Sequence, residues 1–443
     1  MVKMFVFLVN LNKHFCISKN IILNYLLYHM DVENVDILII GAGPSGSVAA
    51  GYLQKQGAKI KVVEKQKFPR IVVGESLIPR VMDHFDEAGL MEALNTKGFE
   101  KKLGARFIRG EEICIFDFSK KFGEGWDWTW QIPRADFDKT MTDELQRKGV
   151  DIAFETEVTD VVFNGTDSVT TLKNRDGIVS QVHAKFVIDC SGYGRVLPRI
   201  LKLESPSKLD PHSAIFTHVK DVNRPEGEEG TQISFDIIET EVWLWVIPFS
   251  NGNTSVGIVG PTDYIEKLSA SGNTSEAIRN AIALSDFYVK RFDGLPFEFD
   301  PIYLKNYSVA VSQFYGDGYA LTGNSTEFLD PVFSSGVCFA TESGILAAKL
   351  ALRQVNGENV DWQKEYAEYM EYGIGVFTTY VKEWYTGNLQ ELFYHQPENP
   401  DVKRKICAVL AGYVWNKENT FVSKHHNIIK NMAYMIRENK MDS

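Results

Sequence analysis

Two tryptophans and a glycine-rich turn are the residues of this sequence with the clearest chemical meaning. Trp243 and Trp245 are separated by one residue, and Ile247-Pro248 follows them. On a strand, this spacing puts both indole rings on one face, where they would form an aromatic wall. Far upstream, Gly41-Ala-Gly43-Pro-Ser45-Gly46 follows an apolar run. Glycines at these positions let the backbone approach a pyrophosphate, so the sequence combines a dinucleotide-type turn with an aromatic partition.

The glycine-rich turn is expected to join a buried strand to a helix. Asp36–Ile40 is short and apolar, and Ser47–Gln56 has the composition of a helix. A second expected strand, Lys59–Val63, ends at Glu64, which stands where an acid that binds a ribose is expected. The start of the helix adds a positive pole for a phosphate. These elements in register favour a dinucleotide site over a glycine-rich turn that only shapes the chain.

The composition fits a globular enzyme with several connected domains. The chain has 443 residues, 44% of them hydrophobic, a net charge of −11, and five cysteines. An acidic chain is unsuited to a phosphate backbone, so we expect no nucleic acid partner. The scattered cysteines are typical of reduced thiols, and no apolar segment is long enough for a bilayer, so we expect a cytoplasmic protein without a membrane span or a metal. Residues 1–29 precede Met30, and we interpret them as an extension or a mis-assigned start.

Two further motifs give the sequence a family resemblance. One is the stretch from Pro69 to Pro79, which contains Gly74-Glu75-Ser76, and the other is Asp330-Pro-Val-Phe-Ser-Ser-Gly-Val337. Together with the glycine-rich turn and the W-x-W-x-I-P motif, they resemble the flavin-dependent halogenases, within the wider family of FAD-dependent aromatic monooxygenases. The match covers about residues 31 to 350. It implies an enzyme of secondary metabolism that uses FAD.

The resemblance also implies which residues contact FAD. These are Gly41, Gly43, Ser45 and Gly46 at the pyrophosphate, Glu64 at the ribose, Arg70 and Arg134 beside the cofactor, and Val158 at the adenine. Near the ribityl chain the family has a Gly-Asp pair, whereas this sequence has Gly323-Asn324. An amide still hydrogen-bonds a hydroxyl, so we expect Asn324 to contact FAD, with somewhat looser binding.

Three places would carry the chemistry that the resemblance implies. Ser335 and Gly336 begin a helix, and their N–H groups would bind halide beside the flavin, unless this helix start only contacts the flavin ring. Lys102 matches the essential lysine of the family. Reduced FAD, O2 and chloride or bromide would give hypohalous acid, which an ammonium group would polarise or a neutral amine would capture; the sequence leaves both open. Trp243 and Trp245 would shield the substrate from the flavin.

Phe333 bears on the choice of substrate. Tryptophan-type halogenases carry a glutamate in the corresponding segment, so Phe333 favours an electron-rich phenol, resorcinol or pyrrole, free or bound to a carrier protein. Because the sequence has no second nucleotide fingerprint, we expect a separate reductase to supply the reduced flavin. The alternative is an FAD-dependent hydroxylase, or a flavin-dependent reductase, that acts directly at the flavin and needs no Lys102.

These motifs require a particular organisation of the chain. We expect an α/β fold in which residues 30–205 and 305–355 form a Rossmann-like FAD-binding domain and residues 206–304 an inserted antiparallel-sheet substrate domain. Residues 356–443 are expected to be helical. In this region one set of residues recurs every three or four positions, and all of its members except Gly373 are aromatic: Trp362, Tyr366, Tyr369, Gly373, Phe377, Tyr380 and Trp384. This spacing predicts one buried helix face, with a lining of the substrate entrance as the alternative.

Overall fold

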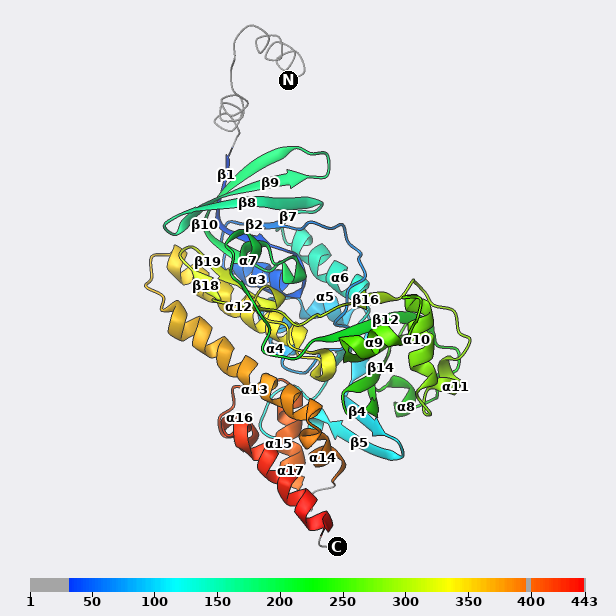
Figure 1. Cartoon of the computed structure of the whole chain (residues 1–443). Helices are drawn as coiled ribbons and strands as arrows, with labels where there is room; N and C mark the ends of the chain where they lie inside the picture. Colours follow the sequence, from blue (N-terminus) through cyan, green and yellow to red (C-terminus); the bar gives the residue numbers. More distant parts are fainter. Residues whose placement is uncertain (1–31, 396–399, 442–443) are drawn as a thin grey trace.

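The computed structural model describes residues 32–395 and 400–441 and has an α/β architecture. Within these residues the chain forms two large sheets, followed by a bundle of helices at the C-terminal end (Figure 1). The extension expected at residues 1–29 lies outside the described residues. The expected α/β fold and the helical C-terminal region are confirmed.

The first sheet has a parallel centre that carries the glycine-rich turn. Its main path runs β18 (Tyr315–Gly316), β19 (Tyr319–Leu321), β10 (Val179–Asp189), β1 (Val32–Ile40), β2 (Ile60–Val63) and β7 (Asp151–Ala153). The strands β19, β10, β1, β2 and β7 are parallel to one another, while β18 pairs with β19 in the antiparallel direction. An antiparallel layer of β8 (Thr156–Asn164) and β9 (Asp167–Asn174) continues from β10. Residues 37–40 of β1 are buried, as is usual for a parallel strand that is covered on both faces.

Two helices pack against each other beside this sheet and bring two distant motifs together. They are α3 (Pro44–Lys55), which follows the glycine-rich turn, and α12 (Gly336–Val355), which follows the Asp330 motif. Helix α3 starts three residues before the expected Ser47, because Pro44 is suited to a first helical position, where no N–H group is needed. Helix α6 (Arg134–Arg147) packs on α3 from another side.

The second sheet carries the tryptophan pair near its middle. Its order is β16 (Ile302–Leu304), β12 (His212–Lys220), β15 (Asn253–Pro261), β14 (Val242–Pro248), β13 (Ser234–Glu239), β4 (Gly104–Arg109) and β5 (Glu112–Asp117). The pairs are antiparallel, as expected, except that β13 and β4 are parallel. The sheet thus takes two strands from outside residues 206–304, and the division into domains remains a prediction.

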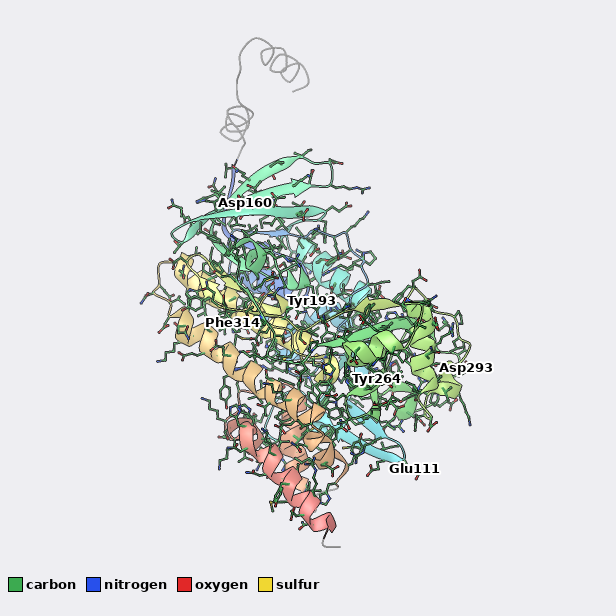
Figure 2. All side chains as sticks on the ribbon, in the orientation of Figure 1. Glu111, Asp160, Tyr193, Tyr264, Asp293 and Phe314 are labelled. Atoms are coloured by element: carbon green, nitrogen blue, oxygen red, sulfur yellow. The ribbon has the colours of Figure 1, made fainter. Side chains whose placement is uncertain are left out.

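The two faces of the second sheet have different partners. Leu244 and Val246 of β14 point to one face, where they pack with Ile278 and Ile282 in the cluster covered by α9 (Thr262–Lys267), α10 (Thr274–Ala283) and α11 (Val289–Phe292). Trp243 and Trp245 point to the opposite face, which joins the main core. Figure 2 labels two residues at the outside of the second sheet and its helices: Glu111, in the turn between β4 and β5, and Asp293, just after α11.

The C-terminal helices bury the predicted aromatic stripe. They are α13 (Glu368–Tyr385), preceded by a π-helical turn at Gln363–Ala367, then α14 (Asn388–Tyr394), α15 (Pro400–Leu410), α16 (Thr420–Ser423) and α17 (His425–Met441). Tyr366, Phe377, Tyr380 and Trp384 are fully buried. Tyr369 stacks on Trp415 with ring centroids 4.9 Å apart. The stripe therefore packs, as predicted.

Two expectations from composition can also be compared with the described residues. Cys114, Cys190, Cys338 and Cys407 are buried free thiols, in agreement with the expectation, while Cys16 lies outside the described residues. Among the helices in residues 32–395 and 400–441, none has the length and apolarity needed to cross a membrane.

Candidate active site

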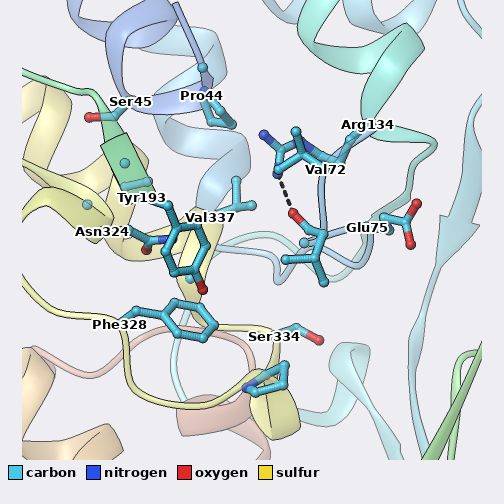
Figure 3. Close-up of a pocket in the computed structure, with 18 of the residues that line it drawn as sticks. Pro44, Ser45, Val72, Glu75, Arg134, Tyr193, Asn324, Phe328, Ser334 and Val337 are labelled. Atoms are coloured by element: carbon cyan, nitrogen blue, oxygen red, sulfur yellow. Dashed lines mark hydrogen bonds between the residues drawn. The ribbon is translucent and has the colours of Figure 1, made fainter. Parts of the chain in front are cut away.

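A cavity of about 420 Å³ collects residues from both sheets and from the loops between them (Figure 3). Its lining includes Gly43 and Ser45 of the glycine-rich turn, Gly74 to Ser76, and both Trp243 and Trp245. A second cavity of about 240 Å³ contains Val158 in its lining. The two cavities share Glu64, Lys65, Ser191 and Gly194, so together they form one path from Val158 to the tryptophan pair.

Glycine is suited to each of the three positions in the turn for a different physical reason. A Cβ on Gly41, whose φ is +102°, would lie 2.4 Å from the carbonyl oxygen of Cys190, and one on Gly46 would lie 2.0 Å from the oxygen of Gly41. Both glycines are needed for packing. A Cβ on Gly43 would meet only the Arg70 guanidinium, at 3.4 Å. Since Gly43 lines the cavity, its missing side chain leaves the backbone open to a ligand at the start of α3.

Glu64 and Ser45 complete this end of the cavity. The buried Glu64 carboxylate accepts hydrogen bonds from the N–H groups of Ala42 (2.9 Å) and Gln66 (2.8 Å), which hold it at the end of β2. The Ser45 hydroxyl donates to Thr322 Oγ1 at 2.7 Å. Because that hydroxyl is engaged within the protein, the main contribution left to Ser45 is its backbone N–H in the first turn of α3.

The two predicted arginines meet at one carboxylate. Arg134 is buried and binds Asp138 through two hydrogen bonds of 2.8 Å, and it donates a third to the carbonyl of Val73, drawn as the dashed line in Figure 3. Arg70 reaches the same carboxylate at 3.5 Å and also lines the cavity. Arg134 therefore fixes the loop that leads to Gly74, while Arg70 keeps part of its guanidinium toward the cavity.

The loop before α12 forms the opposite wall of the cavity, near Asn324, Tyr193 and Phe328 (Figure 3). Ser334 has a left-handed backbone (φ 55°) and Ser335 a right-handed one (φ −78°). Successive residues of opposite hand turn their N–H groups toward a common point, a geometry that is typical of anion-binding nests. Ser334, Gly336 and Val337 line the cavity, so the first turn of α12, its positive end, lies at the cavity wall; Ser335 is buried and is not part of the lining.

The tryptophan pair forms a wall whose two rings are held separately. The centroids of Trp243 and Trp245 are 6.1 Å apart. Trp245 lies flat across Gly257 of β15, where a Cβ would be 2.3 Å from its ring, and its Nε1–H donates to Ser255 Oγ at 3.0 Å. The Nε1–H of Trp243 donates to the hydroxyl of Tyr385 at 3.3 Å. Both rings line the cavity, so the expected wall is present on β14.

Lys102 lies behind the segment from Gly74 to Ser76 and is 2% exposed. It stands at the end of β3 (Glu100–Lys102), which pairs with β6 (Thr129–Gln131), and β6 in turn forms a bridge to Ser76. The Lys102 amine donates to Ser76 Oγ at 2.7 Å. Burial lowers the pKa of Lys102 to about 7. Since Ser76 lines the cavity, its hydroxyl connects the cavity to an amine that is partly neutral near neutral pH.

A comparison with known families identifies the family to which this chain belongs. Residues 34–308 match the model of the family described as FAD binding domain. The chain belongs to the FAD-binding-domain family. A solved flavoprotein/dehydrogenase from Cytophaga hutchinsonii is 50% identical, with a TM-score of 0.90, and the match covers 92% of this chain and 100% of that one.

Relatives of this FAD-binding-domain protein confirm the resemblance to the flavin-dependent halogenases. A 1H-pyrrole-2-carbonyl-[peptidyl-carrier protein] brominase of Pseudoalteromonas luteoviolacea is 28% identical over 88% of this chain and 94% of its own length. The corresponding chlorinase of Pseudomonas fluorescens is 28% identical over 87% and 91%. These matches extend beyond residue 350, where the sequence motifs end, so they include part of the helical C-terminal region.

The residues present fit FAD, which is thereby confirmed as the cofactor of this family member. The open backbone at Gly43 suits a pyrophosphate, Glu64 suits a ribose, and the path toward Val158 gives room for an adenine. The individual contacts of these residues, and of Asn324, with FAD remain predictions.

Three residues of the site were not found from the sequence. Ser76 holds the Lys102 amine, Gly257 makes room for Trp245, and Tyr385 binds Trp243. Only Ser76 lay in a recognised motif, and its role depends on a lysine 26 residues away. Gly257 and Tyr385 act through strand register and tertiary packing, for which a single sequence carries no local signal.

Proposed function

We propose that this protein is a flavin-dependent halogenase that transfers chlorine or bromine to an electron-rich phenol, resorcinol or pyrrole. When bound, reduced FAD supplies the electrons with which O2 and halide are converted into hypohalous acid. The chain's own residues then hold the halide, exclude the substrate from the flavin and direct the oxidant. A separate reductase would supply the reduced FAD.

The buried Lys102 amine is the observation that carries this proposal. It is the feature that a direct hydroxylase or reductase does not need. A lysine without a carboxylate partner costs free energy when buried, and here the amine donates to the Ser76 hydroxyl and lies 5.7 Å from the centroid of the Phe118 ring. Near neutral pH both the ammonium and the neutral amine are populated, so Lys102 is suited either to polarise hypohalous acid or to capture its halogen.

The halide nest and the wall support the other two steps. The N–H groups of Ser335 and Gly336, at the positive end of α12, would hold a halide at the cavity. Trp243 and Trp245 would keep an aromatic substrate from stacking on the flavin, so that only a small oxidant made at the flavin reaches the substrate. Relatives of equal identity include a brominase and a chlorinase, and therefore we propose both halides as candidates.

Phe333 supports a substrate that carries its own activating group. Its ring packs against Tyr380 and Trp384, at 6.2 and 5.7 Å between centroids. No carboxylate is thus supplied from this position to stabilise a cationic intermediate on an indole. A phenol oxygen or a pyrrole nitrogen stabilises that charge itself. The two relatives act on a pyrrole bound to a carrier protein, and we include both free and carrier-bound substrates.

The test is product mass with and without halide. Purified protein, a flavin reductase, NADH and FAD are incubated with a panel of phenols and pyrrole carboxamides in chloride, bromide or halide-free buffer. A halogenase gives products with the isotope pattern of chlorine or bromine only when halide is present. Lys102→Ala is expected to abolish halogen incorporation while FAD binding is retained, and Lys101→Ala, an exposed neighbour, serves as the control. Halogenation retained in Lys102→Ala would contradict the role of the amine.

A second candidate is an oxidoreductase that acts on its substrate directly at the flavin. It is favoured by the continuity of the cavity, because the tryptophan wall and the glycine-rich turn line the same space. The relative of 50% identity is named a flavoprotein/dehydrogenase. In the same assay this candidate predicts oxidised or reduced products that do not depend on halide or on Lys102.

A further inference from the structure

A buried carboxylate lies directly before the loop that carries the halide nest. Asp330 is 2% exposed, and its Oδ1 accepts a hydrogen bond from the N–H of Val332 at 2.9 Å, which caps the turn Pro331–Phe333. Its Oδ2 accepts from two phenols, Tyr307 at 2.6 Å and Tyr385 at 2.8 Å. One carboxylate thus joins the loop to two other segments of the chain.

Tyr385 continues this connection to the tryptophan wall. It is the last residue of α13, and its hydroxyl, which donates to Asp330, accepts the Nε1–H of Trp243 at 3.3 Å. The His212 ring stacks on the Tyr385 ring with centroids 4.2 Å apart, so the phenol has little freedom to turn away. The other member of the wall, Trp245, has its own partner in Ser255.

We propose that Asp330 and Tyr385 are positioning residues that tether the indole of Trp243 to the loop of the halide nest. The direction of the hydrogen bonds supports this assignment. Because the Tyr385 proton is directed to Asp330, the oxygen lone pair of Tyr385 is left for the indole N–H. A carboxylate can accept from both phenols at once, whereas an amide nitrogen at the same place could not.

The consequence for the reaction rests on the proposed function. The same carboxylate that caps the turn before Ser334 to Gly336 also keeps Trp243 in the wall. Halide binding and substrate shielding are then parts of one connected structure. Breaking the link at Tyr385 would leave the nest intact and loosen Trp243. Hypohalous acid would then leak past the displaced indole into solution in place of following the enclosed route to the substrate.

The tether can be tested without an activity assay, by measuring the hydrogen exchange of the indole N–H groups. The chain has eight tryptophans, and in protein labelled with ¹⁵N-tryptophan the signal of Trp243 is assigned by its loss in Trp243→Phe. In Tyr385→Phe we expect the Trp243 N–H to exchange about tenfold faster or more, because a local opening no longer breaks a hydrogen bond. Tyr307→Phe is the matched control, because it also removes a phenol from Asp330 but not the partner of Trp243. In this variant the exchange rate of the Trp243 N–H is expected to stay within about twofold of the wild type.

Asp330→Asn provides a second perturbation, since the amide oxygen can still cap Val332 while its nitrogen cannot accept from Tyr385. We expect faster exchange of the Trp243 N–H in this variant too. Equal exchange in the wild type and in Tyr385→Phe, or an equal rise in Tyr307→Phe and Tyr385→Phe, would overturn the tether.

An activity assay on the same variants separates this inference from the proposed function. With reductase, bromide and a phenol, the ratio of trapped free hypobromous acid to brominated product is expected to rise several-fold in Tyr385→Phe and to stay unchanged in Tyr307→Phe. A wild type that yields neither hypobromous acid nor brominated product would refute the proposed function, while the exchange result would still decide the tether. A ratio unchanged in Tyr385→Phe, despite faster exchange, would refute the shielding role of the tether.

Discussion

Replacing Lys102 by methionine is expected to stabilise the protein more at low pH than at high pH. The lysine pKa is 10.5 in water and about 7 at this buried position. Between these values the unfolded chain binds a proton that the folded chain does not. Folding is therefore weakened as the pH falls from 10.5 toward 7, and the penalty is constant below the folded pKa.

The size of the effect follows from the two pKa values. With about 1.4 kcal/mol for each tenfold change, the penalty in the wild type is about 2 kcal/mol at pH 9 and about 5 kcal/mol at pH 6. Methionine has a similar length and no charge, so its variant carries no such penalty. The loss of the hydrogen bond to Ser76 is the same at both pH values. The stability gain of Lys102→Met over the wild type should thus be about 3 kcal/mol larger at pH 6 than at pH 9.

Urea unfolding followed by tryptophan fluorescence measures this difference. The wild type and Lys102→Met are compared at pH 6 and pH 9, with Lys101→Met as control, because Lys101 is exposed and adjacent. The control is expected to show no comparable change between the two pH values. A gain from Lys102→Met that is equal at both pH values would show that the amine is solvated, and it would remove the basis for a reactive neutral amine.

The other expectations concern the cavity. Gly257→Ala should displace the Trp245 ring, because the new Cβ would lie 2.3 Å from that ring, and should destabilise the fold by about 1–3 kcal/mol. Tryptophan emission checks the position of the ring, and thermal unfolding checks the stability. Gly46→Ala should prevent folding, or cost about 3 kcal/mol or more, because its Cβ would meet a backbone oxygen at 2.0 Å; circular dichroism tests this. Gly43→Ala should fold normally and lose about tenfold or more in FAD affinity, about 1.4 kcal/mol, measured by flavin fluorescence; unchanged affinity would contradict the role of the open backbone. Arg134→Lys should weaken FAD binding and lower the melting temperature, because one amine cannot replace the two bonds to Asp138.

Local patterns in the sequence were sufficient for the first half of the FAD-binding fold. The strand before the glycine-rich turn, the helix after it and Glu64 all lie where periodicity and spacing put them. The strand β1 begins four residues earlier than expected, at Val32, where residues 32–35 continue the pairing with β10. That extension depends on a partner strand about 150 residues away, and no local pattern indicates it.

Long-range pairing and packing account for most of what the sequence could not predict. Strands β4 and β5 join the second sheet through a parallel pairing of β4 with β13, although β4 lies about 130 residues before β13. Lys102 was found by its motif, but its burial and its bond to Ser76 come from the pairing of β3 with β6. In the same way, Asp330 and Trp243 each stood in a recognised motif, whereas the phenol that joins them comes from the end of α13.

The position of β14 inside its sheet has a consequence for how such an enzyme could diversify. Both edges of this strand are occupied by neighbours, β13 on one side and β15 on the other. A strand bonded along both edges cannot swing open as a flap, so the backbone that carries the two indoles is held in place. In the proposed halogenase, an arene would then enter between the surrounding loops and C-terminal helices, and these could change in shape over evolutionary time without a change in oxidant production.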